Sequence, residues 1–313
     1  MIRNSLPYIL AGISVGGQYA LIAIGYTMVY GILRLINFAH GDVFMVSGLL
    51  MVYAAANMPL YLAAPLVIVL TVAIGFVIER AAYMPLRSAP RMSIMISAIG
   101  VSYLLQNLAL YFTGGLNKNY PTIPWISDSV TILEATSQQA ALITKRVTLI
   151  TPFFTIALVA CLVLLIKRTK IGMAMRSVAR DFETSQLMGI KINSVVSMTF
   201  VIGSFLAAVG SMLYFSNYPG VIPTAGSMPG LKAFVSAVFG GIGSIPGAVL
   251  GAFIIGLCES LIKGMDTLLT QAGITSAHLE LATFSDAFTF VLLIVILVFK
   301  PTGLFVEKVS EKV

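Results

Sequence analysis

The chain has 313 residues, of which 58% are hydrophobic and 10% are charged. Soluble domains carry about 25% charged residues, and the mean hydropathy here is +0.97, so the composition excludes a soluble protein. A membrane span needs about 20 apolar residues, which leaves material for about eight spans. We therefore expect one all-α, polytopic membrane domain covering residues 1–313. The formal charge of +7 is concentrated in short loops, which indicates membrane orientation and argues against nucleic-acid binding.

Eight apolar segments follow one another along the chain. The first, residues 6–30, is too long for the apolar region of a secretory signal and is interpreted as a span. The others are residues 38–56, 60–78, 92–113, 148–166, 195–215, 231–262 and 284–299.

One of these segments, residues 231–262, is too long for a single span. A helix of about 32 residues would be about 48 Å long, against a hydrocarbon core of roughly 30 Å. The run Gly240-Gly241-Ile242-Gly243-Ser244-Ile245-Pro246-Gly247 interrupts it, and glycine and proline disfavour a continuous helix. We expect a broken or re-entrant helix here. A similar arrangement at 6–50 leaves an internal repeat as an open possibility.

Basic residues in short loops predict the orientation. Three lie after the third apolar segment, and six lie in residues 167–193: Arg80, Arg87 and Arg91, then Lys167, Arg168, Lys170, Arg176, Arg180 and Lys191. Both loops are expected in the cytoplasm. Residues 114–147 are then external, the amino terminus is external if 38–56 is a full span, and the basic carboxyl-terminal tail is cytoplasmic if 231–262 enters and returns.

The second basic loop carries signals for a short helix at about 182–188. Asp181 is a good N-cap, Glu183 suits the positive end of a helix, and Gly189 suits a left-handed stop. A helix this short is marginal alone, and the apolar Phe182, Leu187 and Met188 would be costly to leave bare. The loop therefore predicts either a partner surface or packing against its own membrane domain.

Three motifs together carry a family resemblance. They are Asn37-Phe38-Ala39-His40-Gly41-Asp42, the loop Arg176 to Ile190, and the run from Gly240 through Gly247 to Ala248. In this order and over essentially the whole chain, they resemble the permease subunit of branched-chain amino-acid ABC importers. The resemblance implies that the loop, with Arg176 among its residues, docks on the ATPase subunit. It also implies two ATP-binding subunits, a second related permease or second copy, an extracytoplasmic binding protein, and an inner-membrane, multi-pass location.

Asn37, His40 and Asp42 begin a span and admit several interpretations. Asp42 can cap the helix that follows it. Alternatively, the three side chains form a gate or part of a substrate path. A His/Asp pair also suggests a proton relay, although the pair is expected near a membrane face.

The glycine break also has two compatible interpretations. Backbone freed at Gly240, Gly241, Gly243, Pro246 and Gly247 can line a path for a zwitterionic substrate, or the glycines can permit close helix packing. Gln18, Asn107 and Glu259 are weaker path candidates, because intramembrane polar groups are functional candidates by default.

The resemblance implies that the function is the import of leucine, isoleucine and valine, without chemistry by this chain. No P-loop sequence occurs, so ATP hydrolysis is expected in a partner chain. No catalytic constellation, cofactor motif or metal-ligand spacing is present, and Cys161 and Cys258 are interpreted as small buried side chains. A related permease for urea or short amides and an ion-coupled secondary transporter are the alternatives, and a membrane-bound enzyme is disfavoured.

Overall fold

The computed structural model describes residues 2–87, 89–134, 142–271, 281–300 and 303–305. Its helices in chain order are α1 (Ile2–Leu33), α2 (His40–Asn57), α3 (Leu60–Ile78), the π-helix η1 (Glu79–Tyr83), the 3-10 helix η2 (Met84–Leu86), α4 (Arg91–Thr113), α5 (Arg146–Arg168), α6 (Lys170–Arg180), α7 (Phe182–Leu187), α8 (Ile192–Asn217), α9 (Ser227–Gly240), α10 (Ile245–Gln271), the 3-10 helix η3 (Leu281–Phe284) and α11 (Ser285–Phe299). The protein is therefore a polytopic helical membrane protein, as the composition predicts.

Seven helical segments among the described residues are long and apolar enough to cross a membrane: Ser5–Leu33, Leu60–Leu86, Arg91–Thr113, Arg146–Arg168, Ile192–Asn217, Ile245–Met265 and Leu281–Phe299. The predicted span at 38–56 corresponds to α2, whose amino-terminal half is almost entirely buried. The overlong segment 231–262 is broken, as predicted: α9 ends at Gly240 and α10 begins at Ile245.

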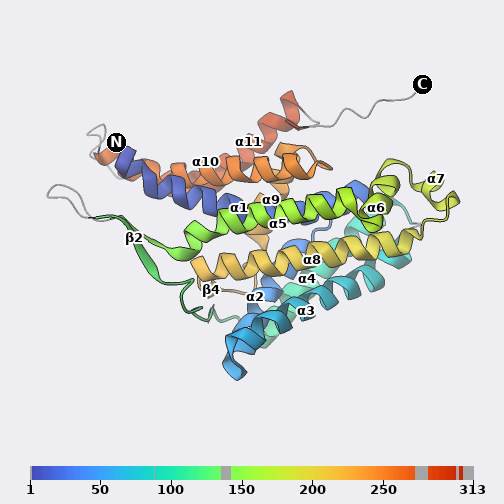
Figure 1. Ribbon diagram of the computed structural model, residues 1–313, viewed down its shortest axis with the longest axis horizontal. Helices are drawn as coiled ribbons and strands as arrows, with labels where there is room; N and C mark the ends of the chain where they lie inside the picture. Colours follow the sequence, from blue (N-terminus) through green and yellow to red (C-terminus); the bar gives the residue numbers. More distant parts are fainter. Residues whose placement is uncertain (1, 88, 135–141, 272–280, 301–302, 306–313) are drawn as a thin grey trace.

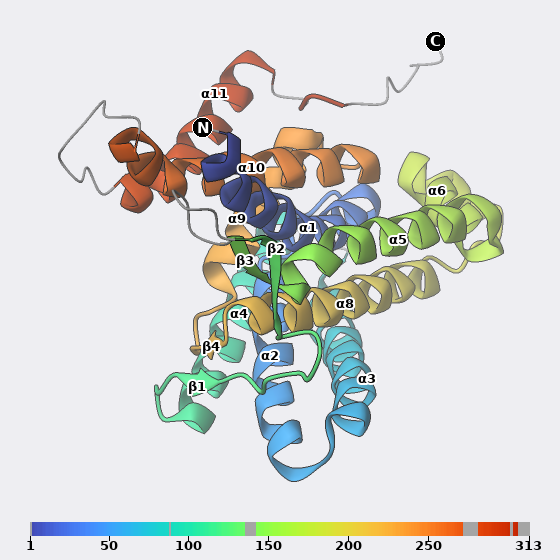
Figure 2. The same ribbon diagram turned by 60° about the vertical axis from the view of Figure 1, so that its left-hand side comes forward.

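The helices form layers around α1 (Figure 2). α1 contacts α5, α8, α9 and α10, and its residues 20–24 are completely buried. α2, α3 and α4 lie on one side of this centre, and α10 and α11 lie on the other. Large apolar side chains such as Val69, Phe153 and Val298 remain exposed on α3, α5 and α11, as expected for surfaces that contact lipid.

The two ends of the bundle differ. The amino terminus and β2 lie at one end, and α6 and α7 lie at the other (Figure 1). The segment predicted as the external loop contains β1 (Lys118–Asn119), β2 (Ser129–Leu133) and β3 (Leu142–Lys145). β2 pairs antiparallel with β3, and β1 pairs with β4 (Gly220–Val221). The segments predicted to be external and cytoplasmic therefore occupy opposite ends.

The basic loop holds more structure than the sequence signals suggested. α6 precedes the predicted short helix, and its amino end is capped by Thr169, whose hydroxyl accepts a hydrogen bond from the Gly172 amide at 3.1 Å. Met175 and Val178 are buried on one face of α6. α6 is thus amphipathic, and its apolar face packs on α5 and α8.

Candidate functional site

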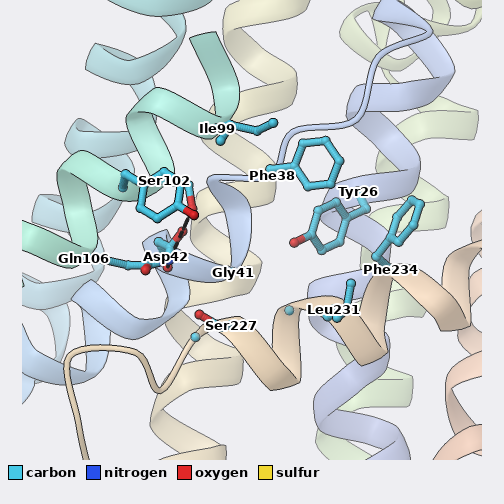
Figure 3. A pocket seen from close by; sticks show the side chains of 13 residues that line it. Tyr26, Phe38, Gly41, Asp42, Ile99, Ser102, Gln106, Ser227, Leu231 and Phe234 are labelled. Carbon is cyan, nitrogen blue, oxygen red and sulfur yellow. Dashed lines mark hydrogen bonds between the residues drawn. The ribbon is translucent and has the colours of Figure 1, made fainter. Parts of the chain in front are cut away.

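A cavity of about 340 Å³ lies between α2, α4 and α9 (Figure 3). Its lining combines one carboxylate, several hydroxyl groups and an amide with aromatic and aliphatic side chains. The lining residues are Tyr26, Phe38, Gly41, Asp42, Ile99, Ser102, Tyr103, Gln106, Gly226, Ser227, Gly230, Leu231 and Phe234. It is hereafter called the α2–α4–α9 pocket.

Asp42 holds the polar side of this pocket. It lies in the first turn of α2, where a negative charge complements the positive end of the helix. Its carboxylate accepts hydrogen bonds from Ser102 Oγ at 2.5 Å and from Gln106 Nε2 at 3.0 Å. α2 has no side-chain cap hydrogen bond, so Asp42 joins α2 to α4 and does not serve as the predicted cap.

Glycine allows α2 and α9 to cross closely at the pocket. A Cβ atom added at Gly41 would lie 2.7 Å from the Gly226 carbonyl oxygen and 3.0 Å from the Gly230 Cα atom. Real Cβ atoms do not approach backbone so closely. The missing side chains bring the first turns of α2 and α9 together and leave room for the cavity beside them.

The other polar residues of the same motif point elsewhere. Asn37 Oδ1 accepts a hydrogen bond from the Tyr83 hydroxyl at 2.7 Å. The His40 ring is buried and packs edge-on against Tyr26, with centroids 5.1 Å apart. Neither Asn37 nor His40 lines the α2–α4–α9 pocket, so only Asp42 among the three predicted polar residues reaches it.

The glycine break forms a tight turn away from the pocket. Gly241 and Gly243 have φ values of +108° and +103°, a region that favours glycine. A Cβ atom at Gly240 would overlap the Gly247 carbonyl, so the ends of α9 and α10 touch through backbone. Pro246 lies in the first turn of α10, where proline is tolerated. This geometry favours the close-packing interpretation of the glycines.

Of the weaker path candidates, two donate hydrogen bonds to backbone carbonyls. Gln18 Nε2 donates to the Leu213 carbonyl of α8 at 3.3 Å, and Asn107 Nδ2 donates to the Tyr103 carbonyl one turn earlier on α4 at 2.7 Å. Neither lines the α2–α4–α9 pocket.

Glu259 instead belongs to a cluster of charged side chains whose pairing was not predicted from the sequence. Lys232 Nζ of α9 lies 2.7 Å from Glu259 Oε1 of α10 and 2.6 Å from Asp286 Oδ1 of α11. Lys263 Nζ lies 2.5 Å from Glu259 Oε1, and the Tyr19 hydroxyl donates to Glu259 Oε2 at 3.0 Å. Two positive and two negative charges thus join α9, α10 and α11, and we call them the Lys232 cluster.

The predicted short helix is present as α7. The Thr184 amide donates to Asp181 Oδ1 at 3.0 Å and its hydroxyl to Oδ2 at 2.5 Å. These hydrogen bonds hold the pKa of the Asp181 carboxyl below its ordinary value. Glu183 lies in the first turn of α7, and Gly189 has a φ of +83°. The cap and stop therefore form as the sequence predicts.

The tip of this loop presents apolar side chains outward. Leu187 is 87% exposed and Met188 is 79% exposed, while Phe182 is 40% exposed. Arg176 is exposed, and its guanidinium donates to the Ile166 backbone carbonyl of α5. Thus Arg176 ties the loop to α5, and Leu187 and Met188 are its most exposed large apolar side chains.

A buried acidic group lies close to the loop. Glu79, the first residue of the π-helix η1, is fully buried and accepts hydrogen bonds from Arg87 and from Ser197 of α8, the latter at 2.7 Å. π-helical turns occur frequently at functional sites. η1 is therefore hydrogen-bonded to α8 through Glu79 and to Asn37 through the Tyr83 hydroxyl.

Comparison with known proteins assigns the chain to a family. The profile described as "Branched-chain amino acid transport system / permease component" matches residues 8–297. The chain belongs to this permease family. It is 37% identical to the high-affinity branched-chain amino acid transport system permease protein BraD of Pseudomonas aeruginosa, over 100% of this chain and 99% of that protein.

Two further relatives show how the sequence similarity differs among permeases. The high-affinity branched-chain amino acid transport system permease protein LivH of Escherichia coli is 38% identical, over 98% of this chain and 97% of that protein. The xylose transport system permease protein XylH of Escherichia coli is 29% identical over only 39% of this chain and 33% of that protein. The full-length likeness is therefore to the branched-chain amino acid permeases.

Proposed function

We propose that this chain is the permease subunit of an ATP-driven importer of leucine, isoleucine and valine in the cell membrane. The observation that carries the proposal is the full-length likeness, at 37–38% identity, to BraD and LivH. Both names describe high-affinity branched-chain amino acid transport. ATP hydrolysis belongs to a partner chain, because a permease component is not itself the ATPase.

The α2–α4–α9 pocket is proposed as part of the translocation path. It lies where two helices shorter than ordinary spans meet, an arrangement that places polar groups within the membrane thickness. Ile99, Tyr103 and Leu231 at its border are 41%, 62% and 40% exposed. The pocket therefore opens to the outside of this chain, which supports a path completed by a second, related permease or by a second copy.

The α7 loop is proposed as the ATPase-coupling element. Leu187 and Met188 are exposed, apolar and at the end of the bundle opposite the amino terminus (Figure 1). A surface of this kind is suited to a protein partner. The complete importer would contain two ATP-binding subunits and an extracytoplasmic binding protein in addition to the two permeases.

Reconstitution into proteoliposomes tests the proposal. Leucine uptake is expected only when this chain is combined with its ATPase, its permease partner and the binding protein, and only with ATP. Omitting the permease partner while doubling this chain separates the heterodimer from the homodimer. Uptake of urea in place of leucine would favour the amide-permease alternative. Uptake by this chain alone, driven by an ion gradient, would identify a secondary transporter and overturn the proposal.

A further inference from the structure

The α2–α4–α9 pocket contains one charged residue among its lining side chains, Asp42. Lys232 of α9 directly follows the lining residue Leu231 in sequence, but it does not line the pocket. Its ammonium group is paired with Glu259 of α10 and Asp286 of α11. An ionised Asp42 makes the pocket negative, because no cationic side chain lines it.

The contacts of Asp42 fit an ionised carboxylate. Each carboxylate oxygen accepts one hydrogen bond, from Ser102 and from Gln106. A carboxylate has about four acceptor positions, so about two remain for a further donor. An ammonium group carries three N–H donors and a full positive charge, and hydrogen bonds between charged partners are about twice as strong as neutral ones.

The rest of the lining suits the apolar part of a small amine. Figure 3 places Ser102 and Gln106 beside Asp42, with Tyr26, Leu231 and Phe234 across the pocket from them. Aliphatic and aromatic groups on one side with a few polar groups on the other are typical of small-molecule sites. The cavity of about 340 Å³ is large enough for one amino acid.

We infer that Asp42 binds the ammonium group of the amino acid during its passage, while the aliphatic side chain lies against the apolar wall formed by Tyr26, Leu231 and Phe234. This inference rests on the proposed function for the location of the path. Ser102 and Gln106 act as positioning residues, because they fix both oxygens of Asp42 toward α4 and leave the carboxylate in one orientation.

Charge-selective thiol labelling tests the inference independently of transport. Ser227→Cys places a thiol in the pocket lining in a background that carries Cys161→Ala and Cys258→Ala. A cationic methanethiosulfonate reagent is expected to react about tenfold faster than an anionic one, because a single uncompensated charge nearby acts on the two reagents with opposite sign. Asp42→Asn should remove most of this difference. Asp128→Asn, which neutralises an exposed external carboxylate, should leave it unchanged.

Leucine uptake by the complete importer supplies the second measurement. Asp42→Asn is expected to lower uptake at least tenfold, while Asp42→Glu retains a measurable part of it and both variants copurify with the ATPase. Equal labelling rates for the two reagents in the Ser227→Cys protein would overturn the inference, with the proposed function intact if that protein transports leucine. Normal leucine uptake by Asp42→Asn would also overturn it.

Failure of the proposed function would be recognised differently. In that case the unmodified complex would not carry leucine, although the labelling difference and its loss in Asp42→Asn would persist. Poor assembly of both Asp42 variants, without a labelling difference in the parent, would assign Asp42 only the structural role of joining α2 to α4 and would overturn the ammonium site.

Discussion

Replacing Lys232 with methionine removes one positive charge from the Lys232 cluster and leaves its two carboxylates in place. The side chains of Lys232 and Glu259 are 6% and 3% exposed, so water cannot replace the lost partner. Breaking a buried ion pair on one side costs about 3–5 kcal/mol. Glu259 retains Lys263 and Tyr19, which places the expected loss near 3 kcal/mol.

The loss should appear as a lower thermal midpoint of the detergent-purified protein. The midpoint is measured by gel filtration of the protein that remains folded after heating. At about 2–4 °C per kcal/mol, Lys232→Met should lower the midpoint by roughly 6 °C or more. The matched control is Lys263→Met, whose lysine is 48% exposed and which should cost about 1 kcal/mol or less.

A double-mutant cycle with Glu259→Gln isolates the interaction. The double variant should be more stable than the sum of the two single losses predicts, because each single change leaves an unpaired partner. A Lys232→Met midpoint within about 2 °C of the parent, or strictly additive losses, would refute the argument that these charges stabilise one another.

The remaining predictions concern the loop, the topology and the glycine break. Gly189→Val should strain the residue at φ +83° by about 1 kcal/mol or more and weaken copurification with the ATPase. Gly189→Asn should be tolerated better. Normal copurification of Gly189→Val would contradict a docking role. A cysteine introduced at Thr122 should react with an impermeant thiol reagent from outside and one at Thr184 should not, and the reverse pattern would invert the topology. Gly247→Leu should lower assembly and thermal stability but not transport per assembled complex, because the site faces the Gly240 backbone. Gly243→Ala should strain only the turn, because the space around Gly243 is open. Impaired transport by a well-assembled Gly247→Leu complex would favour a path role instead.

The sequence predicted the architecture through signals that act within one segment. Apolar length located the spans, and the run from Gly240 to Gly247 required a break because no single helix of that length fits a bilayer. Asp181 and Gly189 specified α7, because a cap and a left-handed stop depend on residues only a few positions away. The structure contains both features.

The pairings across helices were beyond such reasoning. Glu259 was recognised as an intramembrane acid, but its partner Lys232 is 27 residues away and Tyr19 is 240 residues away. Likewise the hydrogen bonds that Asp42 accepts from Ser102 and Gln106 depend on a packing of α4 against α2 that no local pattern encodes. Lys232 carried one usable signal, since a lysine within an apolar segment requires a buried partner.

The contact at Gly41, Gly226 and Gly230 has a consequence for motion. Helices that meet through interlocking side chains must disengage ridges from grooves before they rotate. Here the facing surfaces at these three positions are largely backbone, so a tilt of α9 over α2 would not require side chains to disengage there. Asp42 is hydrogen-bonded to α4, whereas Leu231 and Phe234 belong to α9. A tilt of α9 would therefore widen or narrow the pocket between the Asp42 carboxylate and these two apolar side chains.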